Sequence, residues 1–210
     1  MGRALNDTAV KLIDEAGQLI VHAGYNGFSY ADLAERLGIR KASIHHHFPS
    51  KVDLVVAVVD RQRAAIRAQI EALENGTPDA LAQLLAYVEY WKRCIVDESA
   101  PFCLVGVLAV ELPGLAPEVG TAVRGYFNDL GLWLKRVMAL GIEQGTIQLE
   151  LEPESSSQFF QTTIYGAMVM ARAYGDPSKF NLVVDAFLNR MRTDKGRVTA
   201  TSNARRPGKR

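Results

Sequence analysis

Residues 24–54 read GYNGFSYADLAERLGIRKASIHHHFPSKVDL, and this stretch decides the fold class. Ser29 followed by Asp32 is typical of a helix N-terminus, because the hydroxyl and the carboxylate can satisfy free backbone N–H groups. Gly38 can end that short helix in the left-handed conformation that glycine adopts at little cost. A second short helix is predicted over residues 40–48, so the stretch has the form of a helix-turn-helix.

Three consecutive histidines lie in the second of these helices, and their spacing argues against a metal site. Successive helical side chains diverge by about 100°, whereas helical zinc sites use positions i and i+4. On a helical wheel Ile44 and Phe48 share one arc, which we expect to be buried. Ala42, His45 and His46 lie opposite, where a helix that reads a DNA groove needs small or hydrogen-bonding side chains. A solvated polar face without a partner and an internal affinity tag are the other interpretations of the histidines.

The composition is that of a globular protein. Hydrophobic residues make up 48% of the 210 residues, and no apolar run approaches the roughly 20 residues of a membrane span. The first residues lack the apolar core of a signal peptide, so we expect a cytoplasmic protein without a membrane partner. Two cysteines, Cys94 and Cys103, are too few for a disulfide scaffold and lack zinc spacing. We therefore expect no metal and no cofactor.

The net charge of +1 conceals a basic C-terminal segment, residues 195–210. This segment carries six Lys and Arg residues and no acid, so the rest of the chain has a net charge of −5. Its low apolar content predicts a disordered tail. Any contact with DNA must therefore come from a local patch on an otherwise acidic protein.

The remainder of the chain predicts five or six further helices, so the fold class is all-α. Ser50 with Asp53 repeats the capping pattern before a long helix that we expect to end at Asn75-Gly76. Further helix starts are predicted at Thr77-Pro78, Pro101, Pro117, Pro153 and Asp176-Pro177.

The opening stretch resembles the tetracycline-repressor (TetR) family of bacterial transcription regulators. The family signature runs glycine-aromatic, a capped helix with Asp-(Ile/Leu)-Ala, Gly-Val-Ser, then Tyr-x-His-Phe-x-x-Lys-x-x-Leu. The resemblance covers residues 9–59, about a quarter of the chain. The corresponding residues here are Gly24-Tyr25, Ser29, Asp32-Leu33-Ala34, Gly38-Ile39-Arg40, His45-His46-His47-Phe48 and the stretch from Lys51 to Leu54.

This resemblance implies a homodimeric transcriptional regulator, usually a repressor, that leaves a palindromic operator when a small molecule acts on it. Residues 1–51 would be a three-helix DNA-binding domain containing the helix-turn-helix. Residues 52–194 would bind the effector and form the dimer, and 195–210 would be the basic tail.

The first helix of the pair would be capped by Ser29, which would also touch a phosphate. Base edges would be approached by Lys41, Ala42, Ser43 and His46, and the DNA backbone by His45, His47 and Lys51. The whole set expected at DNA is Ser29, Tyr30, Arg40, Lys41, Ala42, Ser43, His45, His46, His47 and Lys51.

The second helix departs from the family pattern. His45 replaces the usual tyrosine, so a phosphate contact there must use a ring nitrogen and should improve on protonation. Arg40 replaces a common serine, which exchanges a helix cap for a cation. Ala42 stands where glycine is common and offers a methyl group to a thymine methyl. Ala31 stands where arginine is often found. We therefore expect DNA binding to depend on pH and on salt.

Two C-terminal segments, residues 157–175 and 180–191, are apolar on nearly every face. A helix of that kind must be buried on both sides, so a four-helix bundle with a second copy is predicted. A core within one monomer is the alternative. Candidate effector-pocket residues are Trp91, Phe102, Phe127 and Trp133, although aromatic residues at helical spacing also suit a core.

Cys103 is the candidate sensor. In SAPFCLVGVLAVEL, residues 99–112, we expect it in the first turn of a helix whose dipole would stabilise a thiolate. The segment resembles the Cys-Leu-x-Gly-x-Leu-Ala-x-Glu-Leu stretch of a NemR-like branch of the family. In that branch, the resemblance implies a cysteine that senses quinones, aldehydes or hypochlorite. A non-covalent effector, with Cys103 as a buried inert thiol, is the alternative.

Two other functional classes compete with a regulator: an enzyme, and a small-molecule carrier that does not bind DNA. The sequence lacks GxSxG, a phosphate-binding P-loop, GxGxxG after a strand, and HExxH. We therefore expect no enzymatic activity. Salt-dependent, sequence-selective DNA binding would exclude the carrier.

Overall fold

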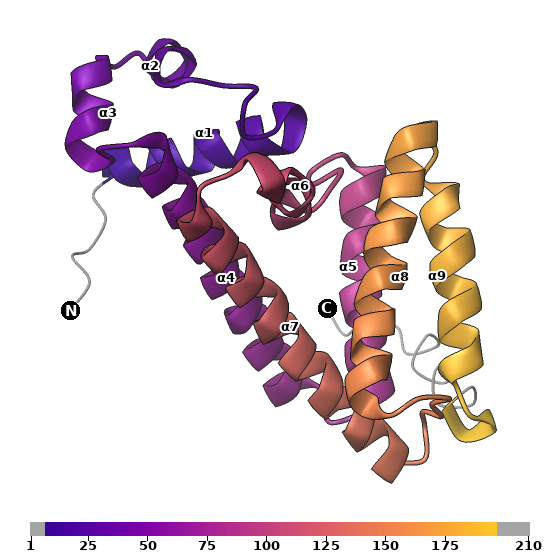
Figure 1. Cartoon of the computed structure of the whole chain (residues 1–210). Coiled ribbons are helices and arrows are strands. Elements are labelled where there is room, and N and C mark those ends of the chain that lie inside the picture. The colour runs from indigo at the N-terminus through magenta and orange to yellow at the C-terminus, as the bar shows by residue number, and fades with distance from the viewer. Residues whose placement is uncertain (1–6, 197–210) are drawn as a thin grey trace, which may run out of the picture. The chain divides into compact units, whose positions relative to one another are not determined.

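The computed structural model describes residues 7–196, which are almost entirely helical (Figure 1). Within this range the only β pairing is an isolated bridge between Ile147 and Arg192. The all-α prediction is confirmed, and six α-helices follow residue 50. The elements are α1 (Asp7–Ala23), α2 (Tyr30–Leu37), α3 (Lys41–His47), α4 (Lys51–Gly76), α5 (Ala80–Val96), α6 (Leu104–Glu111), the 3-10 turn η1 (Leu112–Gly114), α7 (Pro117–Glu143), α8 (Pro153–Tyr174) and α9 (Ser178–Met191).

The contacts between residues divide the chain into two compact units. The first unit contains the described residues up to Arg67 together with Phe102–Asn128. The second contains Ala68–Pro101 and the described residues from Asp129 onward. The helices α4 and α7 each contribute to both units, so the predicted functional regions 1–51 and 52–194 do not coincide with the packing units.

The short helix α2 has the termini that its sequence predicts. The N–H of Ala31 donates to the Ser29 hydroxyl at 3.1 Å, and the Ser29 N–H donates to Asp32 Oδ2 at 2.6 Å, which completes a capping box. The Ser29 hydroxyl also donates to Asp32 Oδ2 at 2.8 Å, and this hydrogen bond, followed by that from the Ser29 N–H, lowers the pKa of the Asp32 carboxyl. Gly38 ends the helix with φ 63°, in the left-handed region.

Capping side chains also set the limits of the neighbouring helices. The helix α3 is one residue shorter at each end than predicted, with Arg40 at its N-cap. The long helix α4 begins after Ser50, whose N–H donates to Asp53 Oδ2 at 2.9 Å, and it ends at Gly76 as predicted. The prediction that the next helix starts at Thr77-Pro78 is wrong. The Asp79 carboxylate accepts from the Ala82 N–H and caps α5, while the Thr77 N–H still closes the last turn of α4.

Pro101 does not start a helix, because the structure begins α6 at Leu104. Cys103 is the N-cap residue of α6, which corrects the prediction that it lies in the first turn. Pro117 and Pro153 are the first residues of α7 and α8, as predicted.

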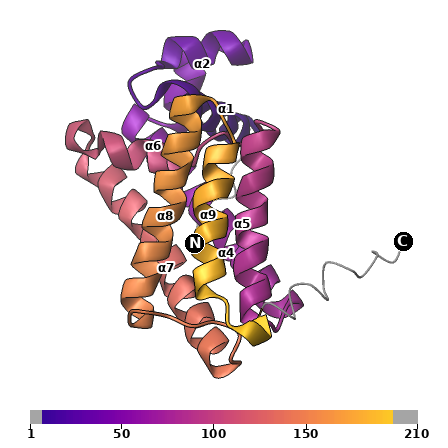
Figure 2. The same ribbon diagram turned by 90° about the vertical axis from the view of Figure 1, so that its right-hand side faces the viewer.

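In the second unit α8 and α9 lie side by side, with α5 against α9 (Figures 1 and 2). Phe160 of α8 and Phe180 of α9 are fully buried. The other face of this pair is not covered by the residues that the structure describes. Its exposed apolar residues are Phe159, Val169, Met170, Tyr174, Leu182 and Val183.

The predicted basic tail falls mostly outside the described residues, which end at Gly196. Its first residue, Lys195, donates through Nζ to the Gln144 carbonyl at 2.7 Å. Among residues 7–196 the structure contains no helix long and apolar enough to span a membrane.

The α2 cap predicts the effect of a substitution on stability. Replacing Ser29 with alanine leaves backbone N–H groups without an acceptor, so we expect the free energy of unfolding to fall by about 1 kcal/mol. Urea denaturation followed by circular dichroism measures this change. Ser29→Thr keeps the hydroxyl and should retain most of the stability. Equal stability of Ser29→Ala and the unsubstituted protein would contradict the role of the cap.

Candidate nucleic-acid interface

One face of α3 packs into the first unit and the opposite face is open. Ile44 is fully buried and Phe48, which follows the helix, is 6% exposed. Ala42, His45 and His46 are exposed, while Ser43 and His47 are half-buried. The buried and exposed arcs of the helical wheel are therefore confirmed. The His46 and His47 rings meet edge to face at 5.3 Å, but the described residues contain no cluster of three His, Cys, Asp or Glu side chains that could hold a metal.

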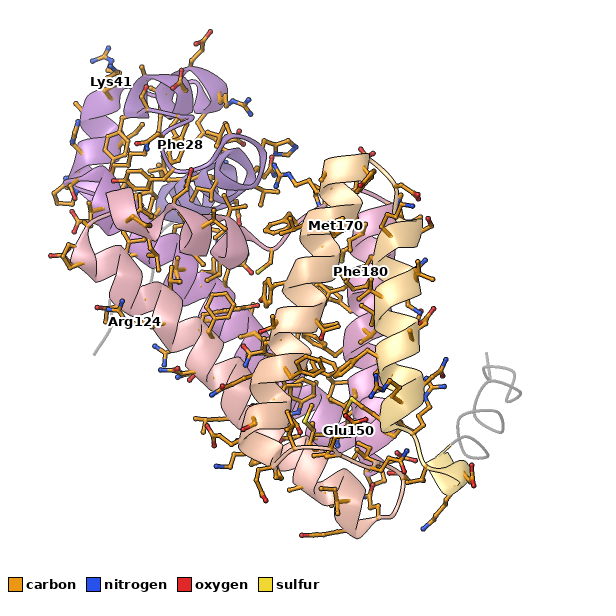
Figure 3. All side chains as sticks on the ribbon, turned by 45° about the vertical axis from the view of Figure 1, so that its right-hand side comes forward. Phe28, Lys41, Arg124, Glu150, Met170 and Phe180 are labelled. Carbon is orange, nitrogen blue, oxygen red and sulfur yellow. The ribbon has the colours of Figure 1, made fainter. Side chains whose placement is uncertain are left out.

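Two cations stand at the N-terminus of α3. Arg40 is exposed and its side chain makes no capping hydrogen bond, so the guanidinium is not used to close the helix. Lys41 is exposed and extends away from the first unit, opposite in direction to the buried Phe28 (Figure 3). Both charges can therefore approach phosphates beside the groove that α3 would enter.

Tyr30 joins α2 to the junction between α3 and α4. The Tyr30 hydroxyl oxygen lies 3.0 Å from the Phe48 carbonyl oxygen and 2.6 Å from the Ser50 carbonyl oxygen, so the hydroxyl can donate to either carbonyl. Burial raises the pKa of Tyr30 to about 12, with further contributions from the charge of Asp53 and from Tyr25. Because the hydroxyl is engaged inside the domain, Tyr30 fixes the angle between the two short helices.

His45 has one ring nitrogen committed to the protein. Its Nδ1 lies 3.1 Å from the Pro49 carbonyl oxygen, and its ring meets that of Tyr30 edge to face at 4.9 Å. A carbonyl can only accept, so Nδ1 must carry the hydrogen. In the neutral ring Nε2 is then a bare acceptor, and it becomes a donor only when the ring is protonated.

Lys51 points into the domain. Its ammonium donates to the carbonyls of Tyr25 and Phe28 and lies over both of their rings, 4.5 and 4.1 Å from the centroids. Burial lowers the pKa of Lys51. The expected phosphate contact of Lys51 stays a prediction, and the geometry assigns its ammonium to the turn formed by residues 24–28.

The candidate effector residues fall into both units. Phe102, Cys103 and Phe127 belong to the first unit, and Trp91 and Trp133 belong to the second. Cys103 is only 4% exposed, with Sγ 4.0 Å from the Tyr126 hydroxyl. Cys94 and Cys103 are both buried, and neither is part of a disulfide.

The two tryptophans of the second unit have buried, unused hydrogen-bond donors. Trp91 is 6% exposed and Trp133 is fully buried, against the ring of Tyr87 at 5.6 Å. Neither indole N–H has a hydrogen-bond partner among the described residues. Because an unpaired buried donor is costly, each of these groups suits an acceptor atom supplied from outside the chain.

A groove of about 530 Å³ lies on the second unit between residues 148–151, α8 and α9. Phe159, Phe187 and Met191 contribute apolar side chains to it. Glu150, labelled in Figure 3, forms an ion pair with Arg190 at 2.6 Å at this groove. The groove therefore continues the uncovered apolar face of α8 and α9.

Two family models match this chain, one for each part of the fold. Residues 12–58 match the model described as bacterial regulatory proteins, tetR family, and residues 80–187 match the tetracyclin repressor-like C-terminal domain. A solved TetR-family transcriptional regulator from Agrobacterium tumefaciens is 43% identical, with a TM-score of 0.86 over 88% of this chain and 97% of that chain. The chain belongs to the TetR family.

Curated relatives agree with this assignment. The HTH-type transcriptional repressor DhaR of Mycobacterium sp. (strain GP1) is 24% identical over 75% of this chain and 79% of its own length. The HTH-type transcriptional repressor NemR of Escherichia coli (strain K12) is 24% identical over 80% of this chain and 85% of its own length. This TetR-family protein is thus a helix-turn-helix transcriptional regulator and not an enzyme, as the sequence predicts.

The contact made by Glu111 at the end of α6 could not be predicted from local sequence patterns. Its Oε2 accepts a hydrogen bond from the Tyr25 N–H in the turn between α1 and α2. The partner is 86 positions away, and only the packing of α6 on α1 brings the two together.

The geometry of His45 predicts a pH dependence of DNA binding. Because Nε2 can donate to a phosphate only in the protonated ring, we expect affinity to fall as pH rises, by about tenfold once the ring has lost its proton. Fluorescence anisotropy at constant ionic strength measures the dissociation constant. His45→Gln should flatten this dependence. His22→Gln is the matched control, because the exposed His22 makes the same kind of Nδ1 contact, to the Gln18 carbonyl on α1. An unchanged pH profile in His45→Gln would contradict the phosphate role.

Proposed function

We propose that this protein is a homodimeric repressor in the cytoplasm that binds a palindromic operator and leaves it when a small molecule acts on the C-terminal region. The observation that carries the proposal is the α3 surface, where Arg40, Lys41, Ala42 and His46 are exposed around a buried Ile44. A helix-turn-helix uses such a surface to enter the major groove.

Base reading would come from Lys41, Ala42, Ser43 and His46. Lysine can donate to guanine, and the Ala42 methyl can meet a thymine methyl. Arg40 would neutralise a phosphate, and protonated His45 would add a second backbone contact.

A second copy is the proposed occupant of the uncovered α8–α9 face. This face exposes six large apolar residues, among them Leu182 at 71% and Phe159 at 54%. Exposed apolar surface of this extent marks an interface. TetR regulators are typically dimeric, and two copies of α8 and α9 related by a two-fold axis would form a four-helix bundle. The same axis would present two α3 helices to successive major grooves of a palindrome.

Leu182→Glu tests the dimer. We expect the unsubstituted protein to sediment with twice the chain mass of 23.1 kDa, and the variant to sediment with that mass once. The glutamate would have to be desolvated in the interface, whereas it is solvated in a monomer. Val110→Glu is the control, because Val110 is 76% exposed on α6, which belongs to the other compact unit. Dimeric Leu182→Glu, or a monomeric unsubstituted protein, would contradict this interface.

The effector would be a neutral molecule with acceptor oxygens. The buried indole N–H groups of Trp91 and Trp133 can only donate, so they select acceptors such as carbonyl groups. The buried polar residues of the described chain are Gln83, Thr146, Ser156 and Ser157, all uncharged. A charged ligand would need a buried counter-charge, and these residues supply none.

Two mechanisms for the effector follow from Cys103. The likeness to NemR supports covalent sensing by the thiol, whereas the burial of Cys103 supports a non-covalent ligand, since reactive cysteines are partly exposed. The present geometry favours the non-covalent mechanism, with Cys103 packed at the start of α6.

A combined DNA-binding and alkylation experiment tests the proposed function. We expect the reduced protein to bind a duplex from upstream of its own gene, with an affinity that falls steeply with salt and exceeds that for a scrambled duplex. Treatment with N-ethylmaleimide should leave this binding intact, because the buried thiols react slowly in the folded protein.

The outcomes separate the mechanisms. Loss of binding that Cys103→Ser prevents and Cys94→Ser does not would make Cys103 the sensor. Equal affinity for both duplexes would contradict the operator proposal. A neutral quinone that cannot alkylate thiols should quench the fluorescence of Trp91 and Trp133, the only two tryptophans, if the acceptor site is correct.

A further inference from the structure

Turn 24–28, the residues that join α1 to α2, is held by a side chain from outside the DNA-binding helices. The Tyr25 N–H donates to Glu111 Oε2 at 2.8 Å. Glu111 is the last residue of α6 and lies in the same compact unit. The carboxylate therefore satisfies a backbone donor of a part-buried turn that no regular secondary structure would satisfy.

The absence of a side chain at Gly24 leaves room for the Glu111 carboxylate. Its φ of +75° lies in the left-handed region, and a Cβ built there would stand 2.2 Å from Glu111 Oε1. Side chains essentially never approach so closely, so any larger residue at position 24 must displace the glutamate. The glycine and the glutamate thus form a matched pair across α1 and α6, whose packing the contacts confirm.

Lys51 binds the carbonyl groups of the same turn, whereas Glu111 binds an N–H group. Its ammonium donates to the carbonyls of Tyr25 and Phe28, while the Glu111 carboxylate accepts from the Tyr25 N–H. Both polar groups of the Tyr25 backbone are therefore bound by charged side chains. The charges of Asp32 and Glu111 also favour the protonated form of Lys51 and oppose the effect of its burial.

We propose that Glu111 is a positioning residue for DNA binding, which fixes turn 24–28 and thereby the placement of α2 and α3 for groove entry. The inference rests on the proposed function, in that DNA binding through α3 is its readout. It adds that α6 controls the reading helices through one carboxylate.

The direction in which DNA affinity changes in Glu111→Ala distinguishes a positioning role from simple charge repulsion. Removing an acid from a DNA-binding domain reduces repulsion from phosphates and should strengthen binding. If Glu111 positions the turn, Glu111→Ala should instead weaken binding to the upstream duplex about tenfold. The dependence of affinity on salt should stay unchanged, because no phosphate contact is lost. Glu111→Gln keeps a carbonyl acceptor for the Tyr25 N–H and should recover most of the affinity.

Glu118→Ala is the matched control. Glu118 is an exposed acid of the same unit, in the first turn of α7, and its removal should leave affinity unchanged or slightly higher. All variants are compared at a temperature where circular dichroism shows them fully folded. Folded Glu111→Ala that binds as tightly as the unsubstituted protein, or more tightly, would overturn the proposal.

Hydrogen exchange provides a test that does not need DNA. Exchange of the Tyr25 amide should be faster in Glu111→Ala than in the unsubstituted protein and nearly normal in Glu111→Gln. If the unsubstituted protein fails to select its upstream duplex, the proposed function fails, and exchange alone decides whether Glu111 holds the turn. Unchanged exchange in Glu111→Ala would overturn the positioning role whatever the DNA result.

A double-mutant cycle tests the match with Gly24. Gly24→Ala should weaken DNA binding strongly when Glu111 is present and less when residue 111 is alanine, because the clash with the carboxylate is then removed. Additive effects of the two substitutions would overturn the claim that they act through one contact.

Discussion

The arrangement of the DNA-binding helices depends on an ammonium group held inside a turn. The helices α2 and α3 contain eight and seven residues, which is too short for either to be stable alone in water. Their positions must therefore come from their connections. Lys51 binds two carbonyls of turn 24–28 from the first residue of α4, and Tyr30 binds the junction between α3 and α4. A part-buried cation is favourable only with such acceptors around it, so the turn and the lysine require each other.

Accurate placement of α2 and α3 is important in this protein because little positive charge is available for DNA binding. The proposed reading face of α3 offers Ala42, Ser43 and His46, none of which carries a permanent charge. Arg40 and Lys41 are the two full cations at the start of this helix. The chain as a whole carries a net charge of +1. Non-specific attraction to phosphates is then modest, and affinity must come from contacts that demand accurate placement. A small tilt of α3 would therefore cost more here than in a strongly basic domain.

Local sequence signals predicted the parts of the fold that local chemistry decides. The Ser29–Asp32 and Ser50–Asp53 caps, the end of α2 at Gly38 and the buried arc of Ile44 and Phe48 are all confirmed. The start of α6 was missed because Pro101 is a permitted first helical residue but not a compelling one. The α8–α9 segments were predicted to be apolar on nearly every face and buried on both sides, and the described residues bury only one face of the pair.

The functional contacts that the sequence did not reveal are those between distant segments. Lys51 was expected at a phosphate from its place in the family signature, and its inward direction depends on carbonyls 23 and 26 positions earlier. Glu111 is further still from its partner. Charged residues of this kind have no periodicity that distinguishes a buried partner from solvent, so only the packed structure identifies them.

The helix α6 is suited to connect an effector with the DNA-binding helices. It has Cys103 at its N-cap and Glu111 as its last residue, about 12 Å apart along a rigid helix of eight residues. Leu104 packs on Gly17 of α1, where even a Cβ would stand 3.3 Å from the leucine, so α6 has little freedom to slide along α1. A change near Cys103 that tilted the helix would shift the Glu111 carboxylate relative to Tyr25. An effector that favours the tilted state by a few kcal/mol would bias the turn away from the DNA-binding arrangement, whether it binds covalently or not. Covalent modification of Cys103 would act directly on the N-cap of this helix, whereas a non-covalent ligand elsewhere would have to reach α6 through the packing around it.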